Sequence, residues 1–203
     1  MVGLLLLALL AGDAEGDWKQ IVTGDVNVFT RLQPGARVHE IRGTMTMKVT
    51  PAEIRAVVTD EGYARRAPYM AEYRTLAHPT PTSWIRYTRL GLPIIEDRDY
   101  FIEVTREADL APDGSGSFKS TWKPWGPDRP ERKGVVRVTV NTGYWSIHPA
   151  ANGTQAEVEY YLMFDPGGSI PAWVAEQGNK RVLPDVMRGL EKECLRRRAE
   201  PKP

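Results

Sequence analysis

The residues of this chain that could do chemistry are few and scattered. Its three histidines, His39, His78 and His148, lie in different segments and share no metal-ligand spacing. The single cysteine, Cys194, excludes an intramolecular disulfide and a Cys-rich metal site. Gly114-Ser115-Gly116-Ser117 lacks both the lysine and the following helix of a phosphate-binding loop. We therefore expect no catalytic residue, no metal and no cofactor.

Two groups of charged residues can be interpreted either as functional or as structural. Glu96-Asp97-Arg98-Asp99 offers paired carboxylates for acid–base work, but an exposed turn closed by an Arg98 ion pair explains the cluster more simply. Arg86 and Arg89 lie on opposite faces of one predicted strand. One of them can point inward, where it requires a carboxylate, a water or a ligand head group.

What the sequence supplies in place of catalytic groups is a set of apolar and adaptable side chains predicted to face inward. Their positions follow a period of two in strands and the spacing of one stripe in a helix. The set consists of Met45, Met47, Ile102, Val104, Val138, Ile147, Tyr160, Leu162, Trp173, Met187 and Leu190. If these side chains pack against one another, they form an ordinary core. If they surround a cavity, they contact a ligand. Periodicity alone does not distinguish the two.

A strand that turns into a long helix positions this set. Five apolar residues at every second position predict the strand: Ala156, Val158, Tyr160, Leu162 and Phe164. Asp165-Pro166-Gly167-Gly168-Ser169-Ile170-Pro171-Ala172-Trp173 follows, with two glycines that permit a reversal and Ser169 as a predicted N-cap. An amphipathic helix is predicted over 170–197, long enough at about 1.5 Å per residue to cross a whole sheet.

The remaining pattern predicts an α+β fold. Residues 18–22 suggest a short helix or turn, and Thr50-Pro51-Ala52-Glu53 is a capping box that opens a helix ending near Thr59. A turn-rich segment follows at 60–68. Strands are predicted at 26–31, 38–49, 70–77, 83–90, 100–106, 117–122, 135–141 and 144–148. Asn152-Gly153 predicts a two-residue hairpin. Short connections favour an antiparallel sheet with helices on one side.

Composition is that of one ordinary globular domain. The chain has 203 residues, 41% of them hydrophobic, and a net charge of only +1, which gives no argument for nucleic acid binding. Residues 2–11 form an apolar run that is too short to span a bilayer and resembles a signal-peptide core, although no basic residue precedes it. We predict a leader over 1–16, a domain over 17–198 and a short tail over 199–203. We expect an exported, periplasmic or secreted protein if the leader is a signal peptide, and a cytoplasmic one otherwise.

From residue 18 to residue 197 the chain resembles the StAR-related lipid-transfer (START) domain family. The resemblance rests on motifs that occur in the family's order. They are 26–31, Thr50-Pro51-Ala52-Glu53, Asp97-Arg98-Asp99-Tyr100, Arg132-Lys133-Gly134-Val135-Val136-Arg137, Trp145-Ser146-Ile147-His148-Pro149, and the segment from Asp165 to Trp173.

The resemblance implies a helix-grip fold, in which a curved antiparallel sheet wraps around the long C-terminal helix and an apolar tunnel between them holds one lipid. The inward-facing set then lines the tunnel. Loop 123–133 corresponds to the family's omega loop, which forms a gate together with the C-terminal helix. Trp125 in this loop either contacts membrane or ligand, or pins the loop to its own domain.

The leading functional hypothesis is a non-catalytic protein that binds and transfers one lipid or other small hydrophobic molecule. We expect a monomer with transient membrane contact and no nucleic acid partner. The alternative is an enzyme resembling polyketide cyclases or aromatases, with Arg86, Tyr87 and Tyr160 as acid–base groups in an apolar cavity. A third reading is an interaction domain with a solid core and no ligand-sized cavity.

Overall fold

The computed structural model describes residues 18–36, 38–92, 95–126, 130–168 and 172–200, and for residues 172–180 it describes the backbone only. The predicted leader and most of the predicted tail lie outside the described residues. Within the described part of the chain, no helix is both long and apolar enough to cross a membrane.

Ten strands and three α-helices make up the described chain. The strands are β1 (Lys19–Val22), β2 (Val26–Arg31), β3 (Glu40–Met47), β4 (Met70–Thr80), β5 (Ser83–Leu90), β6 (Asp97–Ala108), β7 (Phe118–Pro124), β8 (Val135–Arg137), β9 (Val140–Ala150) and β10 (Gln155–Asp165). The helices are α1 (Pro51–Val58), α2 (Glu61–Arg65) and α3 (Ala172–Ala199), and a 3₁₀ turn, η1 (Ala151–Gly153), joins β9 to β10.

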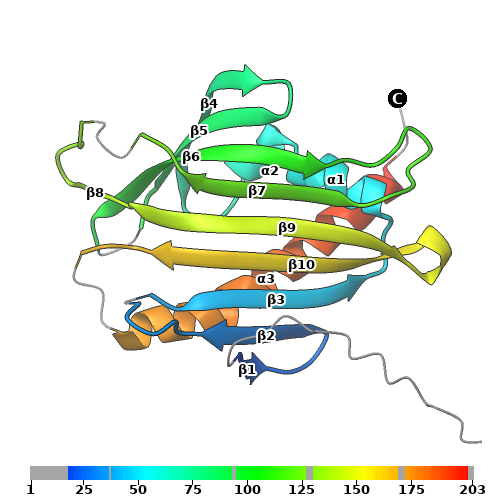
Figure 1. The fold of residues 1–203 in the computed structure, drawn as a ribbon, viewed down its shortest axis with the longest axis horizontal. Helices are drawn as coiled ribbons and strands as arrows, with labels where there is room; N and C mark the ends of the chain where they lie inside the picture. Colours follow the sequence, from blue (N-terminus) through cyan, green and yellow to red (C-terminus); the bar gives the residue numbers. More distant parts are fainter. Residues whose placement is uncertain (1–17, 37, 93–94, 127–129, 169–171, 201–203) are drawn as a thin grey trace, which may run out of the picture.

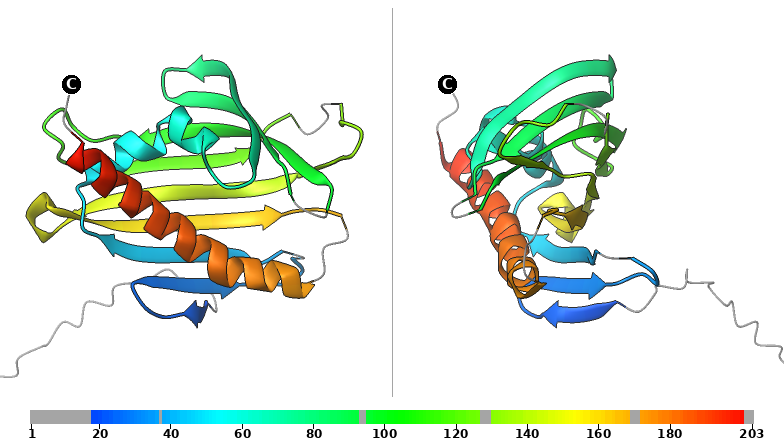
Figure 2. Two further views of the ribbon diagram at one scale, coloured as in Figure 1. Left: turned by 180° about the vertical axis from the view of Figure 1, so that it is seen from behind. Right: turned by 90° about the vertical axis from the view of Figure 1, so that its left-hand side faces the viewer.

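The strands form one open sheet in the order β1-β2-β3-β10-β9-β7-β6-β5-β4 (Figure 1). Neighbours along this path are antiparallel, and β8 lies off the path as a short parallel partner of β6. The last strand, β10, therefore sits in the middle, between β3 and β9. Helix α3 follows β10 in the sequence and begins over the part of the sheet formed by β2 and β3 (Figure 2).

Helix α3 crosses one face of the curved sheet diagonally, and α1 and α2 lie beside its C-terminal part (Figure 2). The opposite face carries no helix in the described part of the chain. This arrangement confirms the predicted helix-grip architecture, with the sheet open and not closed into a barrel.

Local chemistry explains why the helices begin where they do. The Thr50 hydroxyl accepts a hydrogen bond from the Glu53 backbone N–H at 3.3 Å, while the Glu53 carboxylate accepts from the Thr50 N–H at 2.8 Å. This confirms the predicted capping box. Gly167 and Gly168 have φ values of 64° and 65°, so the strand-to-helix reversal uses a backbone conformation that favours glycine. The predicted N-cap, Ser169, lies outside the described residues.

Four local predictions are wrong. The strand predicted at 135–141 is divided into β8 and the beginning of β9, and β9 continues without a break through the strand predicted at 144–148. Residues 19–22 form strand β1, because their backbone pairs with β2. The segment after α1 contains α2, which is capped by the Asp60 side chain accepting from the Gly62 N–H at 2.7 Å. The β9–β10 connection spans four residues, since Ala150 pairs with Gln155, and Ala151 and Asn152 both adopt positive φ within it.

Candidate functional site

The side of the sheet that faces α3, here called the inner face, is fixed by Gly43 in β3. A Cβ atom placed on Gly43 would lie 2.8 Å from Leu183 Cδ2 and 2.9 Å from Met187 Sδ, both on α3. Gly43 pairs with Tyr160, which pairs with Trp145. Because side chains alternate along a strand, the pairing register assigns every second residue of each neighbouring strand to the inner face.

At one end of the inner face the packing is dense. Strands β2, β3, β9 and β10 and helix α1 contribute to one buried cluster with the C-terminal half of α3. Its α3 members, Leu183, Met187, Leu190 and Cys194, recur at three- to four-residue spacing and are at most 6% exposed. Here the sheet and the helix form an ordinary core.

The other end of the inner face, which begins with two residues that still pack against this cluster, Trp145 and Tyr160, carries large side chains that are only half-buried. The ring of Tyr160 lies 4.4 Å from that of Trp145 and 5.7 Å from that of Trp122, centroid to centroid. Tyr100 and Phe164 meet edge to face at 6.2 Å. Each of these five aromatic residues keeps part of its surface uncovered by the described residues. This end therefore offers unburied apolar surface on the face that α3 crosses.

The predicted lining set divides between these two ends. Seven members are buried: Met45, Met47, Val104, Val138, Ile147, Met187 and Leu190. Three members, Ile102, Tyr160 and Leu162, are half-buried. Trp173 begins α3, and its side chain lies outside the described residues. The structure thus brings most of the set to the sheet–helix interface, and the role of its members as ligand contacts stays a prediction.

Sequence reasoning missed Trp122 and Trp145 as members of the half-buried group. Trp122 faces inward because it pairs with Gly143, where its indole occupies the space that a side chain would fill, and it donates to Asn141 Oδ1 at 2.9 Å. The alternation of Phe118, Ser120 and Trp122 in β7 was the signal that could have found the first of them.

Arg86 is the inward-facing arginine of β5. It pairs with Ile102 and lies between Trp84 and Thr88, which face the same way. Its guanidinium carbon lies 5.6 Å from the Tyr73 ring centroid and 5.8 Å from that of Trp84. Arg89 points to the opposite face, where it forms an ion pair with Asp97 at 2.5 Å.

Burial controls the ionisation of the inner tyrosines. It raises the pKa of Tyr100 to about 12 and also raises the pKa of Tyr160. Burial raises the pKa of Tyr73 as well, although the nearby charge of Arg86 opposes this shift. All three phenols therefore remain protonated near neutral pH and present hydroxyl groups that donate hydrogen bonds.

The three residues of the enzyme alternative do not converge. Arg86 and Tyr160 face inward, but Tyr87 lies on the outer face, where its hydroxyl donates to Asp99 Oδ2 at 3.2 Å and accepts from Arg132 Nη1 at 2.9 Å. Among the described residues, no group of three or more His, Cys, Asp or Glu side chains is placed to hold a metal ion.

The charged cluster Glu96-Asp97-Arg98-Asp99 is not the exposed turn that the sequence predicts, because its last three residues begin strand β6. Arg98 and Asp99 are 3% and 1% exposed. Arg98 donates to the backbone carbonyl of Glu96, and to those of Pro166 at 3.3 Å and Gly167 at 3.5 Å. Arg98 is buried because the strand-to-helix junction packs against it, whereas Glu96 remains exposed. Gly167 also lies beside Val136 of β8. Three segments that are distant in sequence therefore meet here: the start of β6, strand β8 and the junction between β10 and α3.

Trp125 lies on the outer side of this region. Its backbone N–H donates to the Phe101 carbonyl at 3.0 Å, and its ring lies 6.4 Å from the Phe101 ring, which in turn lies 4.8 Å from the ring of Tyr87 on the outer face. Trp125 thus contacts its own domain, and its role in a gate stays a prediction. Residues 127–129 of the same loop lie outside the described residues.

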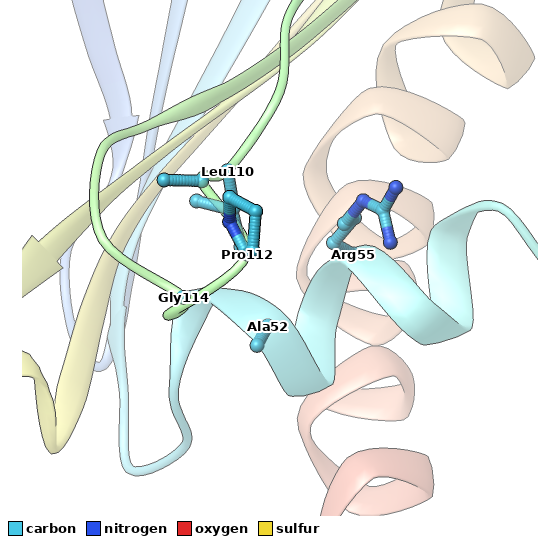
Figure 3. A pocket seen from close by; sticks show the side chains of 6 residues that line it. Ala52, Arg55, Leu110, Pro112 and Gly114 are labelled. Carbon is cyan, nitrogen blue, oxygen red and sulfur yellow. The ribbon is translucent and has the colours of Figure 1, made fainter.

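Two hollows formed by described residues lie away from the half-buried aromatic group. One, of about 290 Å³, lies between α1 and the loop after β6, where Leu110 and Pro112 stand beside Ala52 (Figure 3). The other, of about 630 Å³, is lined largely by polar residues of β3, β9 and β10 such as Thr44, His148 and Glu157. Neither gathers ionisable groups in a catalytic arrangement.

Comparisons with known proteins agree with this architecture. Residues 125–200 match the START domain. An uncharacterized protein of Pseudomonas aeruginosa is 28% identical over 208 residues, which cover 97% of this chain and 100% of that protein. Human START domain-containing protein 10 is 32% identical over 71 residues, which cover 34% of this chain and 24% of that protein.

Solved structures extend the match over nearly the whole chain. The STAR-related lipid transfer protein of Xanthomonas axonopodis aligns with a TM-score of 0.71 and 26% identity, over 87% of this chain and 98% of that one. Human StAR-related lipid transfer protein 5 aligns with a TM-score of 0.77 and 20% identity, over 93% and 90%. With this sheet order, this C-terminal helix and these matches, the chain has the helix-grip fold of START proteins, and its residues 125–200 match the START domain itself.

Proposed function

We propose that this protein binds one lipid or similar hydrophobic molecule between α3 and the half-buried end of the inner face, and carries it without chemical change. The observation that carries the proposal is the unequal packing of this face. One part is a dense core, while Trp122, Tyr160 and Leu162 retain uncovered surface on the same face. Apolar surface left partly uncovered on the face that a helix crosses is favourable for a hydrophobic ligand.

The energetics of such binding follow from burial. An acyl chain lying on this surface removes apolar area from water on both partners, at about 25 cal/mol per Å². The aromatic side chains are already held by one another and by the sheet, so that ordering them on binding costs little. The bacterial relative described as a lipid transfer protein supports a lipid as the ligand.

The ionisable groups favour binding over acid–base catalysis. Arg86 carries a guanidinium, a side chain that donates hydrogen bonds and offers no acceptor for a proton. Tyr160 has a raised pKa and is a poor base or acid near neutrality. Tyr87, the third candidate, lies on the outer face. The inner face therefore supplies walls and hydrogen-bond donors for a ligand.

The test has two parts. Molecules that co-purify with the protein are extracted from it and identified by mass spectrometry, and transfer of labelled lipids between liposomes is measured with the purified protein. Leu162→Trp should fill the half-buried end, and abolish uptake while the fold is kept. Its matched control is Met45→Trp, because Met45 is 8% exposed in the dense core and overpacking there should destabilise the fold by about 1–3 kcal/mol. Protein that carries no lipid and transfers none of several lipid classes would refute the proposal.

A further inference from the structure

Arg86 is set apart from the other arginines of the sheet by its position and its surroundings. Arg31, Arg89 and Arg137 each form an ion pair with a neighbouring carboxylate. Arg86 faces the inner side, and no carboxylate among the described residues forms an ion pair with it. Its Nε atom is buried and has no hydrogen-bond partner among those residues. The same holds for Arg89 Nε, but Arg89 has the Asp97 carboxylate as a partner for its Nη1 atom, so Arg86 differs in lacking an ion pair.

The carboxylate on the facing helix is already engaged. Glu61 of α2 accepts a hydrogen bond from Thr75, the residue that pairs with Arg86 across β4 and β5. Glu61 also forms an ion pair with Arg65 at 2.9 Å. The Glu61 carboxylate is thus shared between Thr75 of β4 and Arg65 of its own helix. The guanidinium of Arg86 is instead flanked by the rings of Tyr73 and Trp84.

A charge in this position costs free energy unless something compensates it. The two aromatic faces stabilise the cation in part, by an interaction that is strongest where water is excluded. They leave the buried Nε–H of the guanidinium without an acceptor, and a guanidinium presents five donors in a fork that fits carboxylate and phosphate oxygens. An anionic group of a bound ligand would supply the missing acceptors.

Neutral hydroxyl groups surround the same place. Thr88 is 2% exposed and follows Arg86 by two residues on the same face, and Tyr100 pairs with Thr88 across β5 and β6. Because the phenols stay protonated, Tyr100 and Tyr73 can donate to an anion and do not repel it. The region thus combines one fixed positive charge with several donors, next to the apolar surface formed by Ile102.

We propose that Arg86 binds the anionic head group of the ligand, so that the molecule carried by this protein is an acidic lipid whose carboxylate or phosphate oxygens pair with the guanidinium. This proposal rests on the proposed lipid-binding function and names the ligand class within it. Removing a charged hydrogen-bond partner of this kind should weaken binding by about tenfold to a hundredfold.

The experiment compares ligands that share a chain and differ in charge. Oleate is paired with oleyl alcohol, and dioleoyl phosphatidic acid with dioleoylglycerol, in equilibrium binding to the full chain. The variants are Arg86→Gln and Arg86→Met, the second of which keeps an unbranched side chain between the two rings. The matched control is Arg89→Gln, on the same strand and the opposite face. Thermal unfolding checks that each variant is folded.

The expected result is that wild type and Arg89→Gln prefer the acidic member of a pair, and that both Arg86 variants lose this preference while still binding the neutral member. A preference in the oleate pair identifies a carboxylate, and one in the phosphatidic acid pair identifies a phosphate. Equal binding of acidic and neutral lipids by wild type, or a preference that survives in both Arg86 variants, overturns the inference and leaves lipid binding intact. Failure of wild type to bind any of the four lipids overturns both proposals.

Discussion

The carboxylate of Asp99 accepts hydrogen bonds from Arg137 Nε at 2.6 Å and Arg137 Nη2 at 3.2 Å, and both side chains are almost fully buried, at 1% and 5% exposed. This pair joins β6 to β8, beside the junction that leads from β10 into α3. Burial of a charge pair is tolerated when both partners are present and is costly when one is removed.

Asp99→Asn should therefore destabilise the protein by about 3–5 kcal/mol, because it leaves the Arg137 charge buried beside a neutral group. Chemical denaturation measures the change. Glu107→Gln is the control, since the Lys119–Glu107 pair is 44% and 43% exposed and its loss should cost no more than about 1 kcal/mol. Equal effects of the two substitutions would show that burial of the pair contributes nothing.

Gly43→Ala should destabilise the contact between β3 and α3. The new methyl group would lie within 3 Å of Leu183 and Met187, and overpacking of this kind costs about 1–3 kcal/mol. Gly24→Ala is the control, because no heavy atom outside its chain neighbours lies within 4 Å of the added Cβ. Thermal unfolding of both variants tests this. A Gly43→Ala protein as stable as wild type would mean that α3 shifts away at no cost.

Stability should fall in acid as the ion pairs of α3 are lost. Hydrogen bonds from Arg198 lower the pKa of Glu53 from 4.5 to about 2, and the hydrogen bond from Arg188 lowers that of Asp25 from 3.8 to about 2. A carboxyl whose pKa is lower in the folded state stabilises the fold above its unfolded pKa, and this contribution is lost as the pH falls through the folded value. The loss for Glu53 therefore runs from about pH 4.5 down to about pH 2.

The midpoint of thermal unfolding, followed by circular dichroism across that range, measures the effect. Glu53→Gln should lower the midpoint at pH 7 and make its dependence on acid shallower, since the ion pair to Arg198 is then absent at every pH. Glu200→Gln removes an exposed pair to Arg196 within the last turn of α3 and should follow the wild-type profile. A Glu53→Gln profile parallel to wild type would contradict the assignment.

The architecture was predictable from sequence because most of its elements depend on local sequence patterns. Alternation marked β10, and the capping box and the paired glycines marked the start of α1 and the reversal before α3. The same patterns place Arg86 and Arg89 on opposite faces of β5. They do not say which face meets the helix, because this depends on the register of β5 through β6, β7 and β9.

The site was less predictable, because it depends on pairings between distant residues. Asp99 and Arg137 are 38 residues apart, and each alone has the composition of a surface residue. Similarly, Trp145 and Met47 both follow strand periodicity, yet one is half-buried and the other is 0% exposed. The difference is the density of packing on the facing side, which alternation along a strand does not record.

Because β10 lies in the middle of the sheet, the sheet cannot be completed until this late segment of the chain has been synthesised. Strand β3 pairs on one side with β2, its neighbour in sequence, and on the other with β10, so that Ile41 meets Leu162 across the sheet. During synthesis this edge of β3, with Met45 and Met47, has no strand to pair with until nearly the whole chain has been made. Unpaired edges of this kind favour association with other chains. Completion of the fold therefore waits for the last strand and the helix that follows it.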